Sequence, residues 1–219
     1  MLALVRYLGS DVARSQTWVP PFLVYVTLCL ADIALGGGTT RNSLPTFATD
    51  AAFLLPVAIW VTVAVGNCED VVQASITVAT VGSETKVRLA KLLVAYLGCA
   101  VLSVFSVAVG WASTGLASPG VTLEGFAAHL TSAAAGVGVG ALCMRPVLDR
   151  RAWAVLAGVF ATLAELIVPD CPPVRQFLVL MDASRPSHLP GGLALIGLES
   201  LALSSALVGA AIGVGRART

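Results

Sequence analysis

The sequence has little charge: Asp, Glu, Lys and Arg make up 11% of its 219 residues, and its mean hydropathy is +0.90. A soluble domain ordinarily carries about 25% charged residues. So few charges cannot cover the surface of a chain that is 57% hydrophobic. The composition therefore excludes an ordinary soluble globule and a disordered chain. It also excludes a nucleic-acid-binding protein, which needs a basic face.

The sequence also lacks clusters of metal-ligating or disulfide-forming residues. Its two histidines, His129 and His188, are isolated, and there is no H-E-x-x-H motif. The five cysteines are scattered without a C-x-x-C pair: Cys29, Cys68, Cys99, Cys143 and Cys171. We therefore expect no metal site, disulfide framework or cofactor in this chain, and no enzymatic activity of its own.

What the sequence does have is long apolar runs of Leu, Val and Ala. Crossing a bilayer takes about 20 apolar residues in a helix, and a barrel strand would instead alternate apolar and polar positions. The runs predict an all-α polytopic membrane protein, with residues 1–219 forming a single transmembrane domain. The six expected spans are about 17–36, 48–66, 87–112, 126–144, 152–168 and 191–214.

The distribution of Lys and Arg predicts the orientation, because cytosolic loops are enriched in them. Only Arg41, Arg175 and Arg185 fall in the odd-numbered loops. All the others lie in the tails and even-numbered loops: Arg6, Arg14, Lys86, Arg88, Lys91, Arg145, Arg150, Arg151, Arg216 and Arg218. Both termini are therefore expected in the cytosol. The excess of Arg over Lys with abundant Ala, Gly and Val indicates a bacterial source and hence the cell membrane.

Residues 1–15 precede the first span and have an amphipathic pattern. Apolar residues line one side of a helix, at Leu2, Leu4, Val5, Leu8 and Val12. The pattern predicts an interfacial helix on the inner leaflet, with a frayed tail as the alternative.

The segment 67–84 between spans two and three carries the strongest local signals. Asn67 suits a helix N-cap, and Glu69 and Asp70 then fall in the first turn, where the helix dipole favours acidic groups. Gly82 suits the C-cap, and Ser83 can cap the next helix. The segment predicts a short cytosolic helix, and one interpretation is that it docks a partner. The alternative is a solvated loop whose basic end touches anionic lipid.

This order of elements resembles the ABC transporter permeases of the type-2 export family. In that family an interfacial helix precedes six spans, and a cytosolic coupling helix between spans two and three inserts into an ATPase subunit. A longer outer segment lies between spans five and six. The counterparts here are residues 1–15, the coupling segment 67–84 and the outer loop 169–190.

The resemblance implies a permease subunit of an ATP-driven exporter that forms the path as a dimer, with a second copy or a similar chain. ATP and Mg would be bound by a separate cytosolic ATPase chain. The cargo would be a drug, an antimicrobial peptide or a lipid. The coupling residues would be Glu69, Asp70, Gln73, Gly82, Ser83 and Glu84. An ATP-independent channel or secondary carrier is the alternative, followed by a membrane-embedded enzyme.

Acidic residues fall at the outer ends of four spans. Asp32, Glu165 and Glu199 are candidates for an anionic path for cationic cargo, with Glu199 the deepest. The alternative is local neutralisation by Arg175 and Arg185. Asp50 is expected to cap its helix after Thr49.

Two further patterns concern helix packing. Gly136-x-x-x-Gly140 and Gly209-x-x-x-Gly213 permit close helix approach. For Gly209 and Gly213 we expect packing within one subunit. His129 is expected to be a packing or interfacial histidine, with a proton relay as the alternative.

Overall fold

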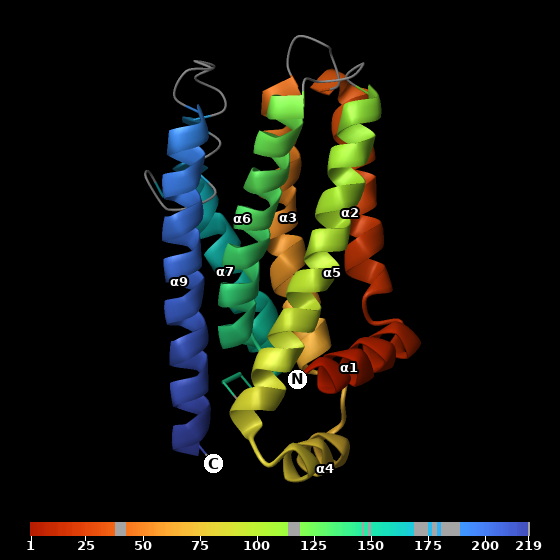
Figure 1. Ribbon diagram of the computed structural model, residues 1–219, viewed down its shortest axis with the longest axis vertical. Helices are drawn as coiled ribbons and strands as arrows, with labels where there is room; N and C mark the ends of the chain where they lie inside the picture. The colour runs from red at the N-terminus through yellow and green to blue at the C-terminus, as the bar shows by residue number, and fades with distance from the viewer. Residues whose placement is uncertain are drawn as a thin grey trace.

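The computed structural model describes residues 1–37, 43–113, 119–145, 147–148, 150–168, 175–176, 179–180 and 189–218. This part of the chain is all-α, as predicted, with α-helices and one π-helical turn (Figure 1). The elements in order are α1 (Leu2–Ser15), α2 (Val19–Asp32), η1 (Ile33–Gly37), α3 (Ser43–Gly66), α4 (Val71–Val81), α5 (Glu84–Ser113), α6 (Pro119–Cys143), α7 (Arg151–Ile167) and α9 (Leu189–Arg218).

The chain bends by 77° between α1 and α2. Gln16 ends α1 in the left-handed conformation, and prolines in the first turn of α2 suit a helix start, where a missing N–H costs nothing. Leu8 and Val12 are buried, and α1 packs against α5. Residues 1–15 are thus helical as predicted, while Leu2 is 86% exposed.

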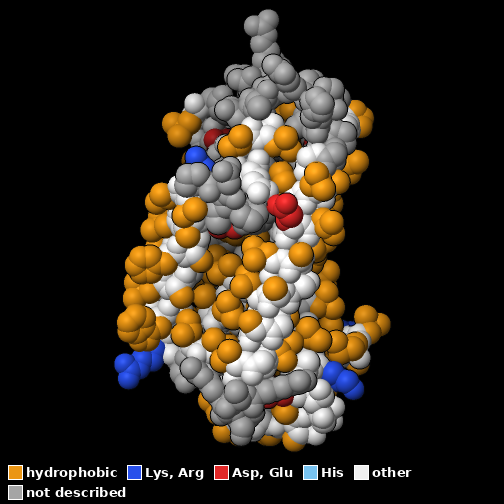
Figure 2. Space-filling view, turned by 90° about the vertical axis from the view of Figure 1, so that its left-hand side faces the viewer, with side chains coloured by type: hydrophobic (Ala, Val, Ile, Leu, Met, Phe, Trp, Pro, Cys, Tyr) orange, Lys and Arg blue, Asp and Glu red, His pale blue; other side chains and the backbone are white. Residues whose placement is uncertain are grey.

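Within the described ranges, four helices are long and apolar enough to cross a membrane: Leu44–Gly66, Glu84–Ser113, Pro119–Cys143 and Ala194–Gly215. A fifth candidate is the bent pair of α1 and α2, counted as one span. The apolar part of α7, Ala152–Glu165, is shorter. Each predicted span coincides with a helix, but length and hydropathy support four or five spans rather than six. Figure 2 shows hydrophobic side chains along most of the visible face, with Lys and Arg chiefly near its lower end.

The core forms where α6 packs against α3, and glycine makes this close packing possible. A Cβ on Gly136 would lie 2.5 Å from the Ala58 Cβ and 2.8 Å from the Leu55 carbonyl oxygen. A Cβ on Gly140 would lie 2.5 Å from the Thr62 Cβ. The glycine pair in α6 therefore serves packing within one chain.

The glycine pair in α9 behaves differently from the prediction. Neither Gly209 nor Gly213 has a neighbour within 4 Å of an added Cβ. The expectation of packing within the subunit is wrong for this pair, because both glycines face open space rather than another described helix.

Candidate functional site: the α4 segment

α4 lies at one end of the bundle, beside α1 and below α5 (Figure 1). Its ends are fixed by local sequence. The Asp70 carboxylate accepts a hydrogen bond from the Gln73 backbone N–H at 2.7 Å. Gly82 adopts the left-handed conformation with φ 70°, and the Ser83 hydroxyl accepts from the Lys86 backbone N–H at 3.4 Å. The predicted capping roles of Gly82 and Ser83 are confirmed.

The predicted N-cap is wrong by one helical turn. Asp70, not Asn67, caps α4, and Glu69 lies before the helix rather than in its first turn. The Asn67 carboxamide oxygen instead accepts a long hydrogen bond of 3.5 Å from the Arg145 backbone N–H. Asn67 therefore helps to join the ends of α3 and α6, where the chain leaves the bundle.

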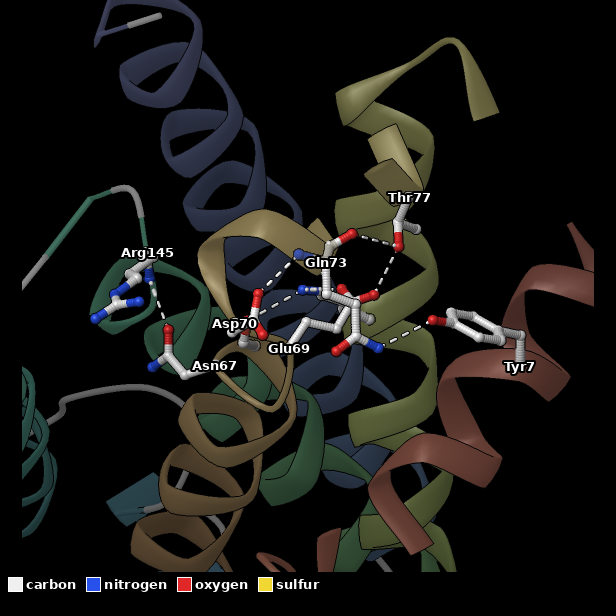
Figure 3. Close-up of polar contacts among 9 residues, drawn as sticks. Tyr7, Asn67, Glu69, Asp70, Gln73, Thr77 and Arg145 are labelled. Atoms are coloured by element: carbon white, nitrogen blue, oxygen red, sulfur yellow. Dashed lines mark hydrogen bonds and ion pairs between the residues drawn. The ribbon is translucent and has the colours of Figure 1, made fainter. Parts of the chain in front are cut away.

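Glu69 points inward and fastens α4 to α5. Its Oε2 atom forms an ion pair with Lys91 Nζ at 2.7 Å. Its Oε1 atom accepts a hydrogen bond from the Thr77 hydroxyl at 2.7 Å (Figure 3). Glu69 is 5% exposed and Lys91 8% exposed. Lys91 Nζ also donates to the Gly66 carbonyl oxygen at 3.2 Å. The contacts of Glu69 are therefore internal, so it positions the segment rather than presenting a charge to a partner.

Two further contacts hold the segment in place. The Gln73 carboxamide donates to the Tyr7 hydroxyl of α1 at 3.0 Å (Figure 3). Arg88 pairs with Glu84 at 2.9 Å and donates to the Ala211 carbonyl oxygen of α9 at 2.8 Å. The structure thus brings all six predicted coupling residues into one region, linked to α1, α5 and α9.

The outer side of α4 is apolar and exposed. Val71, Val72 and Ile76, which we call the α4 ridge, are 70%, 68% and 60% exposed. Beside the helix, a groove of about 780 Å³ is lined by charged groups that include Glu84, Arg88 and Lys91. Val71 of the ridge and other apolar residues line it too. The large exposed side chains of α4 are therefore apolar rather than acidic.

Cys68 lies at the base of this segment. Burial raises the pKa of the Cys68 thiol to about 11, against the opposing effect of Lys91. It therefore stays a neutral thiol near pH 7. Within the described residues, no group of three or more His, Cys, Asp or Glu side chains could hold a metal ion.

The capping role of Asp70 can be separated from its charge. Asp70→Ala removes the acceptor for the Gln73 N–H and is expected to destabilise α4 by about 1 kcal/mol. Asp70→Asn keeps an acceptor and should cost much less, because Asn caps about as well as Asp. Hydrogen exchange of the α4 amides measures both. Equal acceleration in the two variants would show that the charge, not the cap, stabilises the helix.

The three residues predicted to form an outer path lie on different helices. Asp32 is partly buried on α2, Glu165 is 7% exposed on α7, and the Glu199 side chain is exposed on α9. α2 and α9 lie at opposite sides of the bundle (Figure 1), so one chain does not bring Asp32 and Glu199 together. The outer segment 169–190 falls almost wholly outside the described residues.

Asp50 is not a helix cap, because α3 begins at Ser43 and places Asp50 inside the helix. It forms a buried group with Ser106 of α5 and His129 of α6, which we call the Asp–Ser–His cluster. The three residues are 1%, 0% and 0% exposed. The sequence analysis missed this group. One sequence signal could have indicated it. Each of three apolar runs contains a polar residue, and the three residues lie at a similar distance from the same end of the bundle.

The fold and the apolar helices together define a multi-pass α-helical membrane protein. Comparisons with protein families, with curated proteins and with solved structures find no match to this chain.

Proposed function

We propose that this chain is the transmembrane permease subunit of an ATP-driven exporter and that α4 docks a separate ATPase. The observation that carries the proposal is a short helix that projects from the bundle, exposes the α4 ridge and is fixed from behind by the Glu69–Lys91 ion pair. A docking element fixed in advance loses little conformational entropy on binding. Apolar anchors of this kind are typical of the centre of a protein interface.

The topology belongs to the same proposal. We place α7 in the membrane as a fifth span and α9 as the sixth, with α1 on the inner leaflet and both termini in the cytosol. The Lys and Arg distribution supports this orientation, which puts α4 on the cytosolic side. The membrane would be the bacterial cell membrane.

A second copy would complete the translocation path. α9 supports this because much of its apolar surface is exposed, including Leu198 and Leu201 beside the carboxylate of Glu199. A carboxylate on a lipid-facing surface is costly, so a polar path or partner at this position would stabilise it. A drug, an antimicrobial peptide or a lipid would be the cargo, and ATP and Mg would bind to the ATPase chain.

The proposal is tested at the α4 ridge. The proposal predicts that a neighbouring gene encodes a soluble P-loop ATPase. The full chain, tagged and coexpressed with such an ATPase, should copurify with it. Ile76→Asp should weaken the association about tenfold, the effect of losing an anchor of about 1.4 kcal/mol. Ile76→Val keeps the apolar surface and is the matched control.

The thermal unfolding of both variants checks that the bundle is intact. If Ile76→Asp binds the ATPase as the wild type does, α4 is not the docking element. If the unaltered chain neither binds the ATPase nor changes its ATP hydrolysis, the exporter assignment is wrong.

A secondary carrier that needs no ATPase is the second candidate. The observation in its favour is the Asp–Ser–His cluster, because ionisable groups inside a bundle are typical of proton-coupled transport. Uptake or release driven by a pH gradient in vesicles without ATP would support it over the exporter.

A further inference from the structure

The Asp–Ser–His cluster is a continuous chain of hydrogen bonds across three helices. The Ser106 hydroxyl oxygen lies 3.0 Å from Asp50 Oδ2 and 3.1 Å from His129 Nε2. His129 Nδ1 lies 2.7 Å from the Gly125 carbonyl oxygen. The second Asp50 oxygen, Oδ1, has no hydrogen-bond partner among the described residues.

The partners determine which atoms carry hydrogen. A carbonyl oxygen only accepts, so His129 Nδ1 must be protonated and donate to Gly125. Ser106 has one hydrogen and lies between two groups that could both accept it. If the carboxylate and a neutral imidazole are both present, the hydroxyl satisfies only one of them.

One additional proton resolves this conflict in either of two arrangements. In the first, Asp50 is ionised, Ser106 donates to it, and a protonated Nε2 donates to Ser106. In the second, a protonated Asp50 donates to Ser106, which donates to Nε2 of the neutral ring. A concerted shift of two protons along the chain converts one arrangement into the other, with no change in net charge.

We propose that Asp50, Ser106 and His129 form a proton-binding site inside the bundle, which holds one proton shared between the carboxylate and the imidazole. A second proton would leave Asp50 neutral beside an imidazolium and so bury a net positive charge. Loss of the proton would leave a buried carboxylate on which no Lys or Arg of the described residues is shown to act. That state is costly in a low-dielectric interior. With the proton bound, the hydrogen bonds among Asp50, Ser106 and His129 link α3, α5 and α6.

The groups around Asp50 favour a cluster that holds one proton. The titratable groups that act on Asp50 from the neighbouring α2 are Tyr25, Cys29 and Asp32. His129 of α6 reaches Asp50 only through Ser106. None of the described residues shown to act on Asp50 is a Lys or Arg. The Cys29 thiol donates a hydrogen bond to Ser106 Oγ at 3.8 Å. This contact fills the remaining acceptor position of the Ser106 oxygen in both arrangements.

The order of the three residues separates this site from a serine hydrolase. In a hydrolase the imidazole lies between the serine and the carboxylate and takes the serine proton. Here the serine lies between the other two, and the second ring nitrogen faces a main-chain carbonyl. The arrangement is suited to moving a proton along the chain rather than to activating Ser106 as a nucleophile.

The proton count sets the pH dependence of stability. In the unfolded chain an exposed Asp and His titrate near about 3.9 and about 6.5. Above neutral pH the unfolded chain therefore holds no proton on these residues, whereas the folded cluster keeps one. Stability falls with rising pH wherever the folded state binds more protons. The unfolding constant should therefore rise about tenfold per pH unit, up to the pH at which the folded cluster releases its proton. Between about pH 4 and about pH 6.5 both states hold one proton, and the cluster adds no slope.

The test compares unfolding constants of the full chain in detergent from about pH 5 to about pH 9. Asp50→Asn with His129→Gln removes both titrating groups but keeps polar side chains of similar size. Relative to this double variant, the wild type should show the tenfold rise per pH unit above neutral. Parallel curves would overturn the proposal, because the site would then take up no proton.

Further variants keep the test decisive. If the double variant does not fold, Asp50→Asn alone gives the test. This variant should lose the fall in stability above neutral pH. Its stability should instead rise as the pH increases toward about 6.5, because only the unfolded histidine then binds a proton. Asp32→Asn is the matched control and should keep the wild-type slope. Loss of the slope in Asp32→Asn would place the proton at Asp32 instead. A loss of stability when choline replaces sodium at pH 8 would identify a cation site and also overturn the proposal.

Discussion

Lys91→Met is expected to lower the free energy of unfolding in detergent by about 3–5 kcal/mol. The change leaves the Glu69 carboxylate buried without its counterion, although Thr77 still donates to it at 2.7 Å. Glu69→Gln keeps that hydrogen bond but leaves the Lys91 ammonium without its carboxylate partner, so it should destabilise the chain as well. Hydrogen exchange should show α4 amides opening more often in both variants.

The double variant Glu69→Gln with Lys91→Met is the control. It removes both charges, and a buried pair replaced by neutral groups often loses little stability. The double variant should therefore be more stable than Lys91→Met alone. If the two effects simply add, the 2.7 Å ion pair does not fasten α4 to α5.

Gly136→Val is the second substitution with a large expected effect. Even the Cβ atom would come within 2.8 Å of the Leu55 carbonyl oxygen, which belongs to the backbone and cannot rotate away. α6 would have to move away from α3, at a cost of about 1–3 kcal/mol or more. A lower unfolding temperature of the purified chain measures this loss.

Gly209→Ala in α9 is the matched control, because nothing lies within 4 Å of an added Cβ there. Alanine forms helices better than glycine by about 1 kcal/mol, so this variant should be as stable as the wild type or more stable. Similar losses at both positions would contradict the close packing of α6 on α3. A loss at Gly209 that appears only in an assembled dimer would locate the second copy on α9.

Much of the helical framework was predictable, because apolar runs and turn residues act locally. Gly82 ends α4 because the turn there needs a positive φ, which glycine adopts without strain. The N-cap was harder, because Asn67 and Asp70 are both good caps in one short segment. Which one begins the helix depends on where α3 ends, at Gly66, and on the contact of Asn67 with Arg145.

Contacts between distant residues could not be predicted in this way. Glu69 has the sequence pattern of an exposed first-turn carboxylate, but Lys91 on the next helix draws it inward. The Asp–Ser–His cluster depends on the relative depth of three helices, which apolar runs define only to within a turn. The number of spans could not be predicted from the sequence either. α7 is helical as predicted, but its apolar part is short for a membrane span.

α5 carries both Lys91, which holds α4, and Ser106, the middle residue of the proton-binding site. At helical rise the two lie about 22 Å apart along one uninterrupted helix. A partner that shifts or rotates α5 by docking at α4 also changes the distances from Ser106 to Asp50 and His129. Thermodynamic reciprocity then requires that proton occupancy alter the affinity for that partner by the same factor, so either event could report on the other.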